Sequence, residues 1–93
     1  MTITNNINGT GRELVEKLVK RVLGKAYEAS TVIIDDFDLD RVYLTIDGEE
    51  YTIRTWDIHE TEHTVAIRWT LFKSVGDHSD ELSSGESRFN INE

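Results

Sequence analysis

The 93-residue sequence contains no cysteine, which excludes a disulfide scaffold, a thiolate zinc site and a cysteine nucleophile. No stretch approaches the ~18 uninterrupted apolar residues that a membrane-spanning helix requires. Residues 1–6 contain neither a basic stretch nor an apolar run, so no secretory signal is predicted. Together these absences predict a protein of the reducing cytoplasm.

Basic residues are also few: ten lysines and arginines stand against eighteen acids, for a formal net charge of −8. A chain this acidic is repelled by nucleic acid and by anionic membranes, so direct binding to either is not expected. The charge is uneven, because residues 28–62 carry eleven acids and only two arginines. A chain of this length, 38% hydrophobic, has enough apolar material for one domain with a modest core.

An amphipathic helix is predicted to begin near Thr10. Thr10 and Glu13 have the spacing of a capping box, and apolar residues then recur every three or four positions. Gly24 either ends this helix or is tolerated before one last turn. Residues 1–9 are interpreted as a flexible lead-in to a single domain that spans residues 10–74.

Further along the chain the apolar period changes to two, which predicts strands. The segment 31–34 is a short β-branched run, 35–40 is interpreted as an acidic connector, and 65–72 alternates as a long strand. Asp47-Gly48 is the strongest hairpin signal, because a tight type I′ turn needs positive φ at both central residues. The register that follows from this turn pairs Leu44 with Tyr51 and Val42 with Ile53.

The expected fold is therefore α+β. One N-terminal amphipathic helix packs on an antiparallel meander of three to four strands, followed by a polar acidic tail over residues 75–93. Phe89 and Ile91 are the only alternating apolar pair in this tail, and could add a short docking strand at 88–92.

A single helix covers only one face of such a sheet. The other face would present Tyr43, Trp56, Ile58 and Phe72, which is more apolar surface than scattered exposure explains. The tail, a second subunit or a partner would have to cover it. The sequence thus predicts an oligomer or partner face, and a homodimer is expected.

Two motifs resemble metal sites. The segment His59–His63 matches H-E-x-x-H, which binds zinc only when a helix brings both histidines to one face. Here it lies between two period-two segments and is predicted to be a turn. Asp36, Asp38 and Asp40 resemble the start of a calcium loop, but the later glycine and glutamate of an EF-hand are missing. No metal ligand, no cofactor and no catalytic residue is predicted, so the protein is not expected to be an enzyme.

Aromatic and basic residues also allow a single-strand stacking platform. Tyr43, Trp56 and Phe72 beside Arg54 and Arg68 are the types that stack on bases. The surrounding negative field opposes this alternative.

The acidic middle is the most distinctive feature of the sequence. Alternate residues of an extended chain are about 6.6–7 Å apart, a spacing similar to that of nucleic-acid phosphates. Carboxylates arranged in this way would attract proteins that are built to hold DNA. The predicted partner-binding acids are Asp35, Asp36, Asp38, Asp40, Asp47, Glu49, Glu50, Asp57, Glu60 and Glu62.

The small size, the lack of cysteine and proline, the helix followed by a β-meander and the acid-dense segment 28–62 resemble phage-encoded inhibitors that imitate DNA. Acidic anti-CRISPR proteins and phage inhibitors of the bacterial nucleoid protein HU belong to this class. The resemblance implies a non-enzymatic host-takeover protein in the bacterial cytoplasm. Its partner would be a basic DNA-binding protein, such as a nucleoid protein, a nuclease or a polymerase subunit. The alternative is a homo-oligomeric accessory protein whose acidic surface serves only solubility.

Overall fold

Two helices precede the sheet in the computed structural model, which describes residues 10–38 and 40–90. Helix α1 spans Thr10–Leu23 and helix α2 spans Lys25–Ala29. Gly24 separates them with a φ of 58°, a left-handed conformation that costs glycine little. The predicted helix start is confirmed, and Gly24 ends α1 as the first of the two alternatives proposed. Residues 1–9, interpreted as a lead-in, lie outside the described residues.

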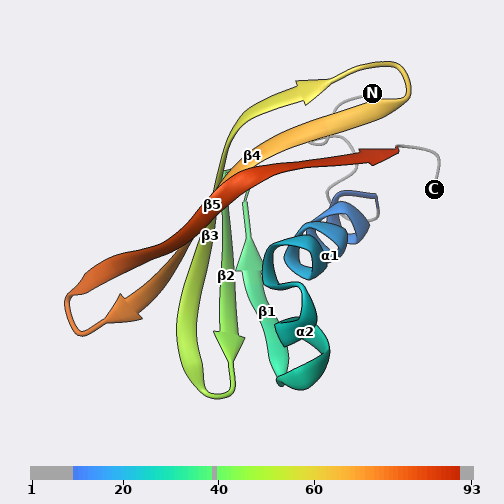
Figure 1. The fold of residues 1–93 in the computed structure, drawn as a ribbon. Coiled ribbons are helices and arrows are strands. Elements are labelled where there is room, and N and C mark those ends of the chain that lie inside the picture. The colour runs from blue at the N-terminus through green and yellow to red at the C-terminus, as the bar shows by residue number, and fades with distance from the viewer. Residues whose placement is uncertain (1–9, 39, 91–93) are drawn as a thin grey trace.

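The sheet is a simple antiparallel meander in which each strand pairs with the next along the chain (Figure 1). The predicted α+β class is confirmed, but the described sheet has five strands rather than three to four. The strands are β1 (Val32–Phe37), β2 (Arg41–Ile46), β3 (Glu49–Glu60), β4 (Thr64–Val75) and β5 (His78–Asn90).

The turn between β2 and β3 forms as its sequence predicts. Asp47 and Gly48 have φ values of 50° and 85°, so both central residues are in the positive-φ region that a type I′ turn needs. Asp47 also accepts a hydrogen bond of 2.8 Å from the Thr31 N–H through Oδ1, which ties the turn to the start of β1. The predicted pairs Leu44–Tyr51 and Val42–Ile53 are both confirmed.

The acidic connector predicted at 35–40 is wrong for its first half. Asp35 and Asp36 belong to β1, where a bulge between Ile34 and Asp36 shifts the pairing with β2. Strand pairing uses backbone groups, so charged side chains can continue an edge strand when they point to solvent. Asp35 also accepts a 2.6 Å hydrogen bond from Thr45 on the neighbouring strand.

The polar tail predicted from residue 75 onward is also wrong. Strand β5 pairs with β4 from His78 opposite Val75 to Asn90 opposite Thr64. Its sequence lacks alternating apolar residues because most of its side chains are exposed. Residues 88–90 of the suggested docking strand belong to β5, and 91–93 lie outside the described residues.

Trp69 explains two of the small residues of β5, Gly85 and Ser87. The indole lies against Gly85, where an added Cβ would be 3.0 Å from Trp69 Cζ2. Trp69 Nε1 donates a 3.1 Å hydrogen bond to the Ser87 hydroxyl, so the buried indole N–H is satisfied. Only a small residue at position 85 leaves room for the Trp69 indole. The indole N–H needs the Ser87 hydroxyl as its hydrogen-bond acceptor.

The hydrophobic core lies between α1 and one face of the sheet, and the long strands β3, β4 and β5 bend around the helix (Figure 1). Leu18 and Val19 of α1 are fully buried there. The Arg21 guanidinium lies 5.0 Å from the centre of the Phe89 ring, which fixes α1 against β5. The face predicted to lie under the helix is confirmed as core: Val42, Leu44, Ile46, Ile53, Val65, Ile67, Trp69 and Leu71 are buried, and Tyr51 packs against them.

Candidate interaction surface

The sheet face turned away from α1, here called the outer face, gathers aromatic and basic side chains. At its centre Tyr43, Thr52 and Phe72 lie side by side on three strands. The next row of cross-strand neighbours consists of Arg41, Arg54 and Thr70, and the row after it consists of Trp56 and Arg68. The face is uncovered within the described chain, and Trp56 keeps 50% of its surface exposed.

A shallow depression of about 300 Å³ lies at the centre of the outer face. Thr70 is its buried floor, while Trp56 and Arg54 form part of its wall. The Arg68 guanidinium lies 5.8 Å from the centre of the Trp56 ring, within the range of a cation–π contact. This contact holds the exposed indole on the sheet.

One residue predicted for the outer face does not belong to it. A bulge in β3 between Trp56 and His59 adds one residue, so that His59 rather than Ile58 is opposite Ala66. Asp57 sits in this bulge with a φ of 54°. Because side chains alternate along a strand, the shift moves Ile58 out of register with Trp56. Tyr43, Trp56 and Phe72 do share the face.

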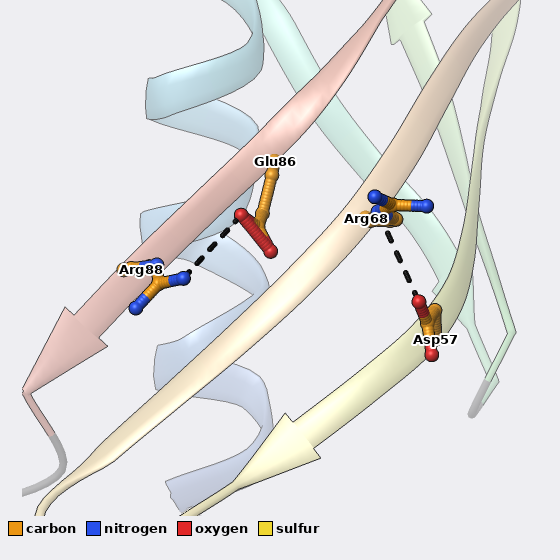
Figure 2. Close-up of polar contacts among 4 residues, drawn as sticks. All are labelled: Asp57, Arg68, Glu86 and Arg88. Carbon is orange, nitrogen blue, oxygen red and sulfur yellow. Dashed lines mark ion pairs between the residues drawn. The ribbon is translucent and has the colours of Figure 1, made fainter.

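Ion pairs lie on the outer face, one between β3 and β4 and one within β5 (Figure 2). Arg68 Nε is 3.8 Å from Asp57 Oδ2, and Arg88 is 3.7 Å from the Glu86 carboxylate. All four side chains are largely exposed, so each pair contributes little stability. Arg88 and Glu86 were missed by sequence reasoning because β5 was interpreted as a tail.

The ten acids predicted to bind a partner are all exposed, but they do not form one array. Asp47, Glu49 and Glu50 lie at the β2–β3 turn, while Asp38 and Asp40 lie at the opposite end of β2. The six residues of β2 span about 17–20 Å between these groups, at ~3.3–3.4 Å per residue.

The acids at the β2–β3 turn already have partners within the chain. Asp47 binds the Thr31 N–H, and Glu49 lies 2.9 Å from the Lys73 ammonium. The hydrogen bond from Lys73 lowers the pKa of Glu49, and the same bond raises the pKa of Lys73. These two acids serve the structure of this end of the sheet.

The second group continues as a line that we call the acidic strip. The strip comprises Asp36, Asp38, Asp40, Asp57, Glu60 and Glu62. The Thr55 N–H donates a 2.9 Å hydrogen bond to the Asp40 carbonyl, so the β1–β2 turn touches β3 where β2 begins. Beyond this point β3 continues to Glu60 without β2 beside it, and the strip follows that free edge into the β3–β4 turn.

Cations lie close to part of the strip. A side-chain hydrogen bond with Tyr43 and the nearby Asp40 carboxylate raise the pKa of Arg41. Asp57 is paired with Arg68 as described above. Glu60 and Glu62 are exposed, and the described residues place no cation within ion-pairing distance of either.

The H-E-x-x-H segment is not helical. His59 and Glu60 lie in β3, and His63 lies in the turn before β4. The turn is thus shorter than predicted, and the helical spacing that a zinc peptidase requires is missing. Among residues 10–38 and 40–90, no three acidic or histidine side chains lie close enough together to hold a metal ion.

No described helix is long and apolar enough to cross a bilayer. No protein family matches the sequence, and neither the curated proteins nor the solved structures contain a match.

Proposed function

We propose that this is a non-enzymatic acidic binding protein that occupies a basic, DNA-binding surface of another protein. The acidic strip carries the proposal, because it contains six exposed carboxylates between β1 and the β3–β4 turn. Its distal members, Glu60 and Glu62, are exposed on an edge that no other described strand covers.

The chemistry of the strip suits a basic partner. Exposed carboxylates without an internal cation keep their field available to an approaching protein, which raises the association rate and disfavours acidic partners. A surface that binds DNA presents lysines and arginines at the spacing of phosphates, and would meet the strip with the same groups. The resemblance to phage-encoded DNA mimics leads us to propose a nucleoid protein, nuclease or polymerase subunit in the bacterial cytoplasm.

Competition with DNA tests the proposal. The tagged protein is used to capture partners from bacterial lysate at low and at high salt, and duplex DNA is then added. We expect a DNA-binding protein to be retained only at low salt and to be released by the duplex. The protein itself should give no mobility shift with the duplex.

A charge-matched pair of variants separates the strip from net charge. Asp36→Asn, Asp38→Asn and Asp40→Asn remove three strip charges. Glu13→Gln, Asp77→Asn and Asp80→Asn remove three charges from α1 and the β4–β5 hairpin. We expect the first triple variant to lose at least tenfold in affinity and the second to lose less than twofold. Equal effects of the two sets would leave the acids a role in solubility only.

A further inference from the structure

We infer that the outer face binds a second copy of this chain, forming a face-to-face homodimer with Trp56 and Arg54 at its centre. This interface overlaps the acidic strip of the proposed function only at Asp36 and Asp57, which lie at its rim. The first argument is composition. Four of the six arginines of the sequence lie on this face, Arg41, Arg54, Arg68 and Arg88, together with one residue of each aromatic type.

Lysine is absent from the described part of the outer face. Lys17, Lys20 and Lys25 lie on the helices, and Lys73 is opposite Tyr51 on the core side. Protein interfaces are enriched in arginine, tryptophan, tyrosine and phenylalanine and depleted in lysine. Tryptophan, tyrosine and arginine also dominate binding energy when they lie at the centre of an interface. A face with four arginines and, among the described residues, no lysine has the composition that is typical of a protein-binding face.

Charge balance favours a second copy as the occupant. Two copies of a chain with net charge −8 repel each other unless they approach through a surface where the charges nearly cancel. The outer face carries four arginines and six carboxylates, a net of only −2, and the carboxylates are Asp35, Asp36, Glu50, Asp57, Glu81 and Glu86. The carboxylates lie toward the rim, which leaves the centre arginine-rich.

The distribution of charges on the outer face fits a dimer with two-fold symmetry. When the symmetry axis lies in the interface and runs perpendicular to the strands, between the row of Arg54 and the row of Trp56, Arg54 comes to lie on the partner's Trp56. On β5 the same axis brings Glu81, which is opposite Phe72, toward the partner's Arg88. In this placement the central arginines meet an aromatic ring or a neutral threonine, so no like charges are forced together at the centre.

The size of the face is adequate. The three long strands β3, β4 and β5 are each about 40 Å long, and the six-residue strands β1 and β2 are each about 20 Å long. At ~4.8 Å of width per strand the whole face measures about 770 Å², close to the ~800 Å² per partner that a standard interface buries. Face-to-face sheets with strands aligned within about 30° are an established packing mode.

Sedimentation equilibrium over a wide concentration range tests the inference. We expect the mass to rise from 10.7 kDa toward twice that value. Trp56→Ala and Arg54→Glu should each raise the dimer dissociation constant at least tenfold. Val75→Ala is the control, because it removes an exposed apolar residue of β4 that points to the side opposite the outer face. It should change the dimer dissociation constant less than twofold.

Tryptophan quenching gives a second readout. Trp69 is buried and Trp56 is half exposed, so acrylamide quenching reports mainly on Trp56. Quenching should decrease as the concentration passes the dimer dissociation constant.

A monomer at every concentration, or a dimer that Trp56→Ala and Arg54→Glu leave intact, would overturn the inference. So would a monomer whose Trp56 is shielded by an added oligothymidine, because the face would then be a nucleic-acid platform. A strip variant that leaves Asp36 unchanged, Asp38→Asn with Asp40→Asn, should dimerise normally, so the two proposals can fail separately.

Discussion

Gly85 lies in close contact with the Trp69 indole, and a Cβ added there would be 3.0 Å from Trp69 Cζ2. The indole covers the glycine, and its N–H is held by Ser87 two residues further along β5. Because the hydrogen bond fixes the ring from one side, the ring has little freedom to move away from a larger residue at 85. Position 85 therefore needs glycine because there is no room for a Cβ, and not because of an unusual backbone conformation.

Gly85→Ala should destabilise the protein by about 1–3 kcal/mol, the usual cost of overpacking a core. The loss in the free energy of unfolding is measured by denaturant titration, with tryptophan emission as the signal. Ser84→Ala is the control, since Ser84 is opposite Thr70 on the outer face and does not touch the indole. Equal stability of the Gly85→Ala variant and wild type would show that Trp69 can shift.

The Glu49–Lys73 pair predicts a pH dependence. The pKa of Glu49 is lower in the folded state than the ~4.3 of an unfolded glutamate, chiefly because Lys73 donates a hydrogen bond to it. A depressed carboxyl pKa contributes stability at neutral pH, and the contribution is lost as the pH falls through the folded value.

Wild type should therefore melt at a higher temperature than Glu49→Gln at pH 7, and the difference should shrink as the pH falls below the ~4.3 of an unfolded glutamate through the lower folded pKa. Thermal melts from pH 7 to pH 3 measure it. Glu50→Gln, which preserves the Glu49–Lys73 pair, is the control. A difference that stays constant as the pH falls would mean that the pair adds nothing to stability.

At the scale of elements, the last strand decides how the core is closed. Phe89 of β5 is buried between α1 and β4, and Arg21 of α1 stacks on its ring. The Arg21 guanidinium also reaches the Arg88 carbonyl at 3.4 Å. Strand β5 thus connects the helix layer to the sheet as well as pairing with β4.

Removing residues 78–93 should abolish cooperative folding, because β4 would lose one of its two neighbouring strands and the core would lose Phe89. Circular dichroism and thermal melting of the truncated protein test this. Phe89→Ala preserves the strand and should cost about 3–5 kcal/mol. A truncated protein with the wild-type melting transition would show that β5 is dispensable, as a tail would be.

At the scale of the whole molecule, the excess of acids opposes folding. The described chain measures 40 × 24 × 22 Å, so many like charges lie within the ~30 Å Debye length of 10 mM salt. At physiological ionic strength that length falls to about 8 Å, and most of the repulsion is screened.

Raising the salt concentration from 10 to 150 mM should therefore raise the melting temperature at pH 7. The triple variant Asp36→Asn, Asp38→Asn and Asp40→Asn should melt higher than wild type at 10 mM salt and gain less from added salt. Differential scanning calorimetry measures both. A melting temperature that falls with salt would mean that attractive ion pairs, such as Glu49–Lys73, outweigh the repulsion.

Local chemistry was sufficient to predict part of the fold. The spacing of apolar residues predicted α1, and Asp47-Gly48 set the register of β2 and β3, because a two-residue turn fixes which residues are opposite each other. Alternation predicted which face of the sheet lies under the helix. Tyr43, Trp56 and Phe72 were placed together on the other face by the same alternation.

Other features were decided by tertiary structure. The sequence of β5 has no strand pattern, because β4 supplies its backbone partners and most of its side chains are exposed. The bulge at Asp57 moved Ile58 out of the outer face, since one extra residue reverses the alternation that follows it. The predicted acids were divided between two ends of β2, because proximity along the chain does not set proximity across a sheet. The sequence by itself determined the faces and turns, which depend on neighbours a few residues apart. The fifth strand, the bulges and the grouping of charges depend on contacts between distant strands, and only the folded sheet brings those together.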